Sequence, residues 1–525
     1  MKILHNARIH TLDPVRPLAS ALAIDAGRIV ALGADELLSR YDRAEKQDMG
    51  GRVVLPGLID AHLHLHYYAL SLQKIDCETD TLAECLRRVE MRVASSDSGG
   101  WILGHGWNQN TWGGAWPHAA DLDRLAPDHP VYLTAKSLHA AWANTVALRL
   151  AGITPATPDP KDGRIQRDEQ GQPTGILLEN AMLLVGDIVP EPDVKGLADA
   201  IDRAQPILWK MGLTGVHDFD RRESFMALQQ LHADDRLKLR VTKNIPVDLL
   251  DHAVALGLRT GFGDDWLRIG SVKVFMDGAL GPRTAAMFQP YDGEPDNRGI
   301  LNLDGEQLFE LGRRAAGTGL GMTVHAIGDR ANHEVLDAYE HLRAHEAENG
   351  LPHLRHRIEH VQLLHPSDVP RLARLNVIAS MQPIHATSDM LMADKYWGER
   401  TSYAYALRSQ LDSGAHVAFG SDAPVESPNP FWGIHAAVTR RRANGAPGPA
   451  GWRPEQRLSM QQAIEGFTTG PAFAAYAEDR QGRLAPGCFA DLIVLEKDPF
   501  TVDPAEVKDF QSSATMVGGD WVYEA

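Results

Sequence analysis

The sequence predicts an α/β protein: a TIM (β/α)8 barrel with a small β-sandwich domain formed by both termini and a large insertion after the first barrel strand. Eight apolar segments alternate with helical patterns, which is typical of a closed parallel barrel. Short β segments recur at both ends of the chain, and one connection is much longer than the others. The 525 residues are enough for a large core and more than one structural unit.

The small sandwich is expected to combine residues 1–56 with residues 485–525. Two or three strands with an open edge need further partners before they are stable, and the two termini can provide them for each other. The β segments that predict this domain are Ile3 to Ile9, Ala21 to Ile24, Arg28 to Leu32, Phe489 to Leu495 and Met516 to Tyr523.

The barrel is expected over residues 57–484. Between its strands lie segments with the apolar stripe of a helix that buries one face, as in Val335, Ala338, Tyr339 and Leu342. The eight predicted strands are Gly57 to His64, Leu213 to Phe219, Lys238 to Ile245, Arg268 to Phe275, Gly321 to Ile327, Arg357 to Val361, Val377 to Met381 and His416 to Ser421.

The insertion is expected at about residues 67–195, because about 145 residues separate the first two predicted strands and a βα connection needs far fewer. One helix is predicted over Thr81 to Val93, and another over Val194 to Lys210 leads back to the barrel. Trp107 and Trp112 lie in a glycine-rich stretch and are interpreted as the aromatic wall of a substrate lid. The alternative is that these large side chains form the insertion's own core.

The composition argues against several classes of function. The net charge of −17, from 52 basic and 69 acidic residues, disfavours a nucleic acid or an anionic membrane as partner. Cys77, Cys85 and Cys488 form no CxxC pair, which argues against a disulfide framework or a thiolate zinc site. Neither a signal-peptide pattern nor a long apolar run occurs. We therefore expect a cytoplasmic protein that acts on a small molecule, with a homodimer as the expected assembly.

Residues of metal-binding type gather at the ends of the predicted strands. His62 and His64 are two apart at the end of the first strand, and strand side chains alternate with period two, so both imidazoles share one face. His325, His360 and Asp422 end the fifth, sixth and eighth strands. Each of these residues alone is commonly a core, turn or cap residue, but their joint occurrence at one rim predicts a metal centre.

Lys273 lies among apolar residues of the fourth predicted strand, where an unpaired charge would be costly. A lysine in a dry, cationic site loses its proton easily, and the neutral amine can add carbon dioxide to become an anionic ligand. Asp422 is the expected general base and acid. Glu359 precedes His360 on its strand, so its side chain is expected to point away from the site.

These segments resemble the amidohydrolase superfamily, and within it the branch that contains the N-substituted formamide deformylases. The resemblance covers nearly the whole chain and rests on residues 56–64, 106–107, 272–281, 325–329, 359–360, 420–424 and 487–492. It implies a binuclear site in which His62, His64 and Asp422 hold one divalent metal ion, His325 and His360 hold the other, and a carboxylated Lys273 bridges them. The residues assigned to substrate binding are Trp107, Trp112, His139, Asp277 and Arg283.

Zinc is the expected metal, and manganese, cobalt and iron are alternatives that imidazole and carboxylate ligands also accept. Two such ions polarise a carbonyl and lower the pKa of a shared water to about 7, which makes hydroxide available at neutral pH. The predicted function is therefore hydrolysis of the C–N bond of a small neutral amide. The resemblance implies an N-substituted formamide that yields formate and an amine. A deaminase, a cyclic amide or ester hydrolase, and a catalytically idle regulator are the alternatives.

Overall fold

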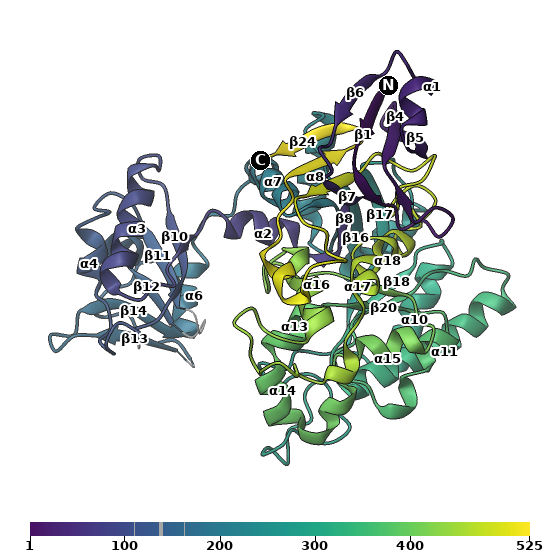
Figure 1. Cartoon of the computed structure of the whole chain (residues 1–525). Helices are drawn as coiled ribbons and strands as arrows, with labels where there is room; N and C mark the ends of the chain where they lie inside the picture. Colours follow the sequence, from purple (N-terminus) through teal and green to yellow (C-terminus); the bar gives the residue numbers. More distant parts are fainter. Residues whose placement is uncertain (110, 136–139, 162) are drawn as a thin grey trace. The chain divides into compact units, whose positions relative to one another are not determined.

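The computed structural model describes residues 1–109, 111–135, 140–161 and 163–525. The chain divides into two compact units. The first comprises Met1–Tyr68 and Leu197–Ala525 and contains the barrel and the sandwich, and the second comprises Ala69–Gly196 (Figure 1).

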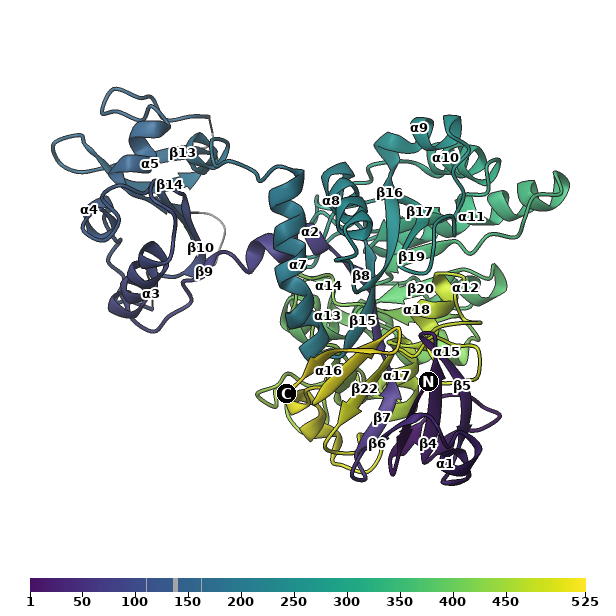
Figure 2. The ribbon, with the colours of Figure 1, turned by 90° about the horizontal axis from the view of Figure 1, so that it is seen from above.

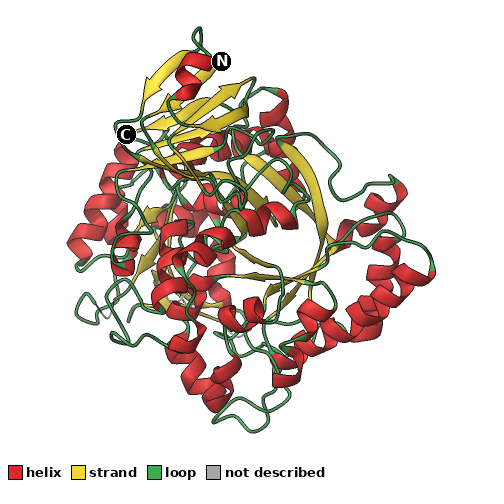
Figure 3. Ribbon diagram, turned by 45° about the vertical axis from the view of Figure 1, so that its right-hand side comes forward, coloured by secondary structure: helices red, strands yellow, loops and turns green. Residues whose placement is uncertain are grey.

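The predicted barrel is confirmed. Within the described residues, an eight-stranded sheet runs in sequence order with parallel pairing throughout, and its strands surround the centre of the first unit with helices outside them (Figure 3). The first two strands are buried along their whole length, as expected for parallel strands covered on both faces. The strands are β8 (Leu58–Leu63), β15 (Leu213–Asp218), β16 (Arg240–Pro246), β17 (Leu267–Phe275), β18 (Met322–Ala326), β19 (Arg357–His360), β20 (Ile378–Met381) and β21 (Val417–Phe419).

The segment after β21 returns to β8 and brings the two ends of the sheet together. The backbone N–H of Asp422 donates to the His62 carbonyl at 2.7 Å, and the His64 N–H donates to the Ala423 carbonyl at 2.8 Å. Gly420 makes this approach possible, because a Cβ there would lie 2.4 Å from the His62 nitrogen. The ends of the first and eighth strands are therefore held beside each other, and the residues that follow them share one rim.

Most helices outside the barrel bury one face, whereas α13 (Pro383–Ser388) and α16 (Pro430–Thr439) are buried over nearly all of their residues. In α11 the predicted stripe of Val335, Ala338, Tyr339 and Leu342 is buried. Among the described residues no helix is both long and apolar enough to cross a membrane. The helices between and after the barrel strands are α7 (Val194–Lys210), α8 (Arg222–Ala233), α9 (Leu250–Ala255), α10 (Gly305–Ala316), α11 (Asp329–Glu348), α12 (Arg371–Arg374), α13 (Pro383–Ser388), α14 (Met390–Trp397), α15 (Leu407–Asp412), α16 (Pro430–Thr439), α17 (Met460–Gly466) and α18 (Thr469–Ala474).

The sandwich consists of two sheets, with strand orders β5-β4-β1-β6 and β24-β23-β22-β7-β2-β3. Strand β22 pairs antiparallel with β7, so strands from both ends of the chain share the second sheet, coloured yellow and purple in Figure 2. The segment Ile3 to Ile9 is not one strand as predicted, because Asn6 has a φ of 52° and sends β1 and β2 into different sheets. The strands are β1 (Lys2–His5), β2 (Arg8–His10), β3 (Leu18–Ala19), β4 (Ala21–Asp25), β5 (Arg28–Gly33), β6 (Glu45–Asp48), β7 (Val53–Pro56), β22 (Leu492–Leu495), β23 (Ala514–Val517) and β24 (Asp520–Glu524), with α1 (Glu36–Arg40) beside them.

The second unit is built on a mixed sheet with strand order β13-β14-β12-β11-β10-β9. Its helix α3 begins after Thr81, whose side chain accepts a hydrogen bond from the Glu84 N–H, and it buries Cys85 and Val89. The elements are α2 (Leu65–Ser71), which enters the unit, β9 (Ile75–Asp76), α3 (Leu82–Ala94), β10 (Ile102–Trp107), α4 (Ala119–Asp123), β11 (Val131–Ala135), β12 (Ala140–Ala143), α5 (Thr145–Leu150), β13 (Gly163–Arg167), β14 (Pro173–Glu179) and α6 (Leu183–Gly186).

Candidate metal centre

Four of the predicted histidines meet at the carboxyl ends of the barrel strands. The ring centroids of His62 and His64 lie 5.7 Å apart, and those of His62 and His360 lie 4.9 Å apart. His325 joins the group through His360, with 4.5 Å between their ring centroids. The register of the parallel strands explains this, because Ala326 of β18 lies beside His360 of β19.

Asp422 lies among these imidazoles. Its Oδ1 is 3.4 Å from Nε2 of both His62 and His64, and its Oδ2 is 4.0 Å from Nε2 of His385. Within the described part of the chain, two sets of groups can each hold an ion, with ligand atoms within 4.8 Å of one another: His62, His64 and Asp422, and His360, His385 and Asp422. Nε2 of His62 and of His385 are buried without a hydrogen-bond partner among the described residues. Buried nitrogens of this kind beside a carboxylate fit a divalent cation.

The outer nitrogens of three histidines face hydrogen-bond acceptors. An acceptor at Nδ1 holds the proton there and leaves the Nε2 lone pair for a metal. The ring orientation of each ligand is therefore set by a second residue. The three contacts join His62 to Glu359 Oε2 at 2.6 Å, His64 to Asp220 Oδ1 at 2.9 Å, and His360 to Gln382 Oε1 at 2.8 Å.

The prediction that Glu359 points away from the site is wrong. Its carboxylate is fully buried inside the barrel, where it contacts His62 and pairs with Arg357 at 2.8 Å. His360 has a φ of 76°, so the chain leaves the strand conformation there and the alternation of sides that the prediction assumed does not hold. Both residues consequently serve the same centre.

The surroundings favour the neutral form of His62 and His325, the protonated form of His64 and an ionised Asp422 carboxylate. Burial, reinforced by the Lys273 charge, lowers the pKa of His62 to about 4 and that of His325 to about 3. Burial opposes ionisation of Asp422, but its hydrogen bond with His64 and the nearby histidines outweigh burial and hold the Asp422 pKa well below its usual range. Burial also opposes protonation of His64, yet hydrogen bonds to Asp220 and Asp422 raise the His64 pKa to about 9.

Lys273 is buried on β17 with its ammonium nitrogen 4.7 Å from the ring centroids of both Phe219 and Phe275. Burial lowers the pKa of Lys273 to about 8, against the opposing attraction of Glu359 and Asp422. A neutral amine is the form that can add carbon dioxide, so this environment suits the predicted carbamate. The modification itself stays a prediction.

The residues predicted to bind substrate have different surroundings. Asp277 is buried, and its carboxylate accepts hydrogen bonds from the backbone N–H groups of Ala286, Ile327 and Gly328, so it joins two loops of the barrel rim. Arg283 pairs with Glu294 at 2.7 Å. His139 lies outside the described residues.

Trp107 belongs to the core of the second unit and not to an exposed wall. Its side chain is fully buried and its indole N–H donates to the Leu133 carbonyl at 2.8 Å. Trp112 stacks on it with 6.3 Å between ring centroids, and its own N–H donates to the Thr79 carbonyl at 2.9 Å. The sheet and helices of the insertion pack around these large side chains. Trp107 therefore belongs to the insertion's own core, which was the alternative to a substrate-binding wall.

Three acidic or imidazole groups of the centre were not predicted. Asp60 accepts from the hydroxyl of Ser421 at 2.5 Å and joins the first strand to the segment after the eighth. Asp220 supports His64, and His385 lies on α13 after the seventh strand. Asp220 stands two residues after Asp218 at the end of a strand, a spacing that could have indicated a second inward-facing carboxylate.

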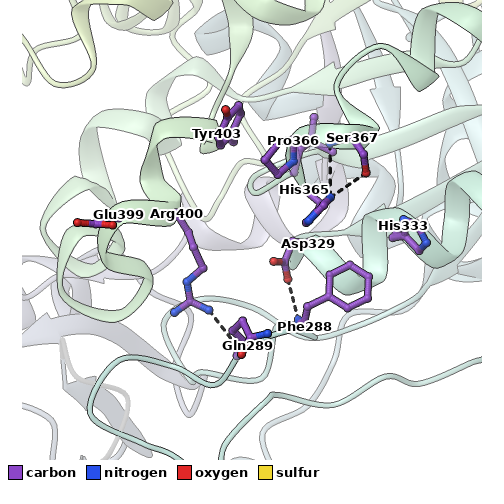
Figure 4. A pocket seen from close by; sticks show the side chains of 11 residues that line it. Phe288, Gln289, Asp329, His333, His365, Pro366, Ser367, Glu399, Arg400 and Tyr403 are labelled. Carbon is purple, nitrogen blue, oxygen red and sulfur yellow. Dashed lines mark hydrogen bonds between the residues drawn. The ribbon is translucent and has the colours of Figure 1, made fainter.

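A separate pocket of about 600 Å³ lies among the segments that follow β17, β18, β19 and β20 (Figure 4). Several of its polar side chains are already bonded within the protein. Arg400 donates to the Gln289 carbonyl at 2.9 Å, and the Asp329 carboxylate accepts from the Phe288 N–H at 2.9 Å. The candidate metal ligands are not part of its lining, so the pocket is distinct from the centre.

A family model described as "Amidohydrolase family" matches residues 45–523. Protein LONG AFTER FAR-RED 3 of Arabidopsis thaliana is 35% identical, over 99% of this chain and 91% of its own length. A Bacillus subtilis (strain 168) protein described as "Putative amidohydrolase YtcJ" is 32% identical over 99% of both chains. N-substituted formamide deformylase of Arthrobacter pascens is 29% identical, over 99% of this chain and 97% of its own length.

A solved structure is also similar to this chain over nearly its whole length. A metal-dependent hydrolase from Pyrococcus furiosus, described as uncharacterized, has a TM-score of 0.79 and 30% sequence identity, and the match covers 95% of this chain and 100% of that chain. The similarity thus extends over both units.

Proposed function

This chain belongs to the amidohydrolase family, and from that premise we propose that it is a metal-dependent hydrolase that cleaves the C–N bond of a small neutral amide. Its centre would hold two divalent ions, with zinc as the expected metal. When bound, such ions polarise a carbonyl and lower the pKa of a water molecule to about 7.

The position of Asp422 carries the proposal. Its carboxylate lies 3.4 Å from Nε2 of both His62 and His64, and nearby histidines keep it ionised, so it can accept the proton of the attacking water. The same carboxyl group then delivers that proton to the leaving nitrogen, which departs as a neutral amine. Burial of Asp422 excludes bulk water from this transfer.

The proposed substrate is an N-substituted formamide, hydrolysed to formate and an amine. The similarity to the Arthrobacter pascens deformylase supports this choice. The net charge of −17 supports a neutral substrate over a highly anionic one.

A hydrolysis screen of the zinc-loaded protein tests the proposal. The screen would compare N-formyl, N-acetyl, cyclic amide and ester substrates with amidine substrates that a deaminase would attack. We expect the fastest turnover with N-formyl amines, and Asp422→Asn should lower kcat by about 10²- to 10⁴-fold. Asp498→Asn, at a buried carboxylate paired with Arg8 and His10 in the sandwich, is the matched control and should keep its kcat. Turnover of esters or amidines without amides would move the chain to another chemistry, and near-normal kcat in Asp422→Asn would remove Asp422 from its role.

A further inference from the structure

His385 is a buried histidine that the amino-acid pattern did not single out. It lies on α13, which begins directly after β20, and only 6% of it is exposed. Its Nε2 has no hydrogen-bond partner among the described residues and lies 4.0 Å from Asp422 Oδ2. A buried, unpaired nitrogen beside a carboxylate calls for a ligand.

The chain around β20 turns His385 toward the same point as His360. Gln382, which follows the strand, fixes His360 through its amide oxygen at 2.8 Å from Nδ1. Pro383 begins the helix, and His385 follows within its first turn. The two imidazole rings lie parallel, 6.2 Å apart with 8° between their planes, and their ligand atoms lie within 4.8 Å of each other and of Asp422.

The outer nitrogen of His385 is part of a chain of hydrogen bonds. The Gln362 amide lies between His385 and Tyr405, with its Nε2 3.3 Å from His385 Nδ1 and its Oε1 3.2 Å from the Tyr405 hydroxyl. The Tyr405 hydroxyl also donates to the Asp389 carboxylate at 2.7 Å. A hydroxyl has one proton, and a carboxylate attracts it more strongly than an amide oxygen does.

The proton of Tyr405 therefore determines which nitrogen of His385 is free. With that proton on the Asp389 side, the Tyr405 oxygen can only accept, and a half-turn of the Gln362 amide places its NH2 group there. The Gln362 oxygen then accepts from Nδ1–H of His385. This leaves the lone pair on Nε2, the same arrangement that Gln382 imposes on His360.

We propose that His385 is a metal ligand through Nε2 and shares one ion with His360 and Asp422. The inference depends on the proposed metal centre but not on the choice of substrate. It adds a ligand from the seventh strand's end to the set that the resemblance implies. Gln362 acts as a positioning residue for it.

Cobalt binding tests this inference apart from catalysis. Apo protein would be titrated with Co²⁺, with visible absorption and elemental analysis as readouts, for the wild type, His385→Ala and His385→Gln. His435→Ala is the matched control, because His435 is also buried on a helix that follows a barrel strand. The apo melting temperature and circular dichroism of each variant establish that it is folded.

We expect both His385 variants to weaken the binding of one cobalt ion at least about tenfold, since even residues that only orient metal ligands contribute about 10- to 100-fold. His435→Ala should titrate as the wild type. In the proton NMR spectrum of the cobalt protein, one strongly shifted exchangeable N–H signal should vanish in His385→Gln. Unchanged cobalt affinity and an unchanged set of shifted signals in the His385 variants would overturn the inference alone. A wild-type protein that binds no cobalt would overturn the metal centre and this inference together, whereas a negative hydrolysis screen would leave the cobalt result standing.

Discussion

Glu359 accepts a hydrogen bond from Nδ1 of His62 at 2.6 Å, with both side chains enclosed in the barrel. The same carboxylate pairs with Arg357 at 2.8 Å. A carboxylate behind a histidine fixes the ring and makes its far nitrogen a better donor to a metal. The contacts from Arg357 to Glu359 and from Glu359 to His62 therefore connect the barrel interior with the proposed metal position.

Replacing this carboxylate should weaken metal binding. We expect Glu359→Gln to reduce metal affinity about 10- to 100-fold, because the amide holds the imidazole less firmly and makes it a weaker ligand. Competition with a chromophoric chelator measures the affinity. Glu346→Gln is the control, since Glu346 is an equally buried carboxylate between His356 and Arg343 on α11. Equal metal affinities in the two variants would contradict the role of Glu359.

A chelator that removes the metal should lower both the metal content of the protein and the stability of its folded state. We expect the fully loaded protein to contain two divalent ions per chain, because the site offers more ligands than one tetrahedral ion uses. Ions that bind only the folded state stabilise it by about 2.7 kcal/mol at a free concentration 100-fold above Kd. Elemental analysis and melting curves with and without a chelator check the two points. Metal content that saturates at one ion per chain would contradict the binuclear centre.

The amino-acid pattern was sufficient to predict the barrel, because its strands are apolar runs bounded by turn residues. It was also sufficient to predict most candidate metal ligands, because they stand at the carboxyl ends of those runs. It was insufficient where a side chain depends on local backbone geometry. The φ of 76° at His360 brings Glu359 into the centre, and nothing in the residue types predicts a left-handed histidine. His385 was missed because it lies on a helix, where a lone histidine resembles an ordinary core residue.

The burial of Trp107 changes what its removal should do. We expect Trp107→Ala to destabilise the second unit by about 3 to 5 kcal/mol, because it leaves a cavity in the core. Hydrogen exchange of β10 and β11 would report the loss. KM should change equally for benzyl and small alkyl formamides. Trp116→Ala, at an exposed position against the same ring, is the control. A KM increase confined to benzyl substrates, with normal exchange protection, would restore the wall interpretation.

The last prediction concerns Lys273, whose buried amine lies between two phenylalanine rings beside the centre. A bare ammonium would repel two dications, whereas a carbamate would bridge them as an anion. Lys273→Ala should therefore lose metal and activity, and a short carboxylic acid that enters the vacated space should restore part of both.

Lys243→Ala is the matched control for Lys273→Ala. Lys243 is a buried lysine of the neighbouring strand β16, paired with Asp218 at 2.7 Å. Its loss leaves a buried carboxylate unpaired, which typically costs about 3 to 5 kcal/mol, so the variant should lose stability without any rescue by acids. Because added acids replace a missing carboxylate and not a missing ammonium, rescue limited to Lys273→Ala indicates carboxylation. Crystals of the active, metal-loaded enzyme with an unmodified Lys273 would contradict it.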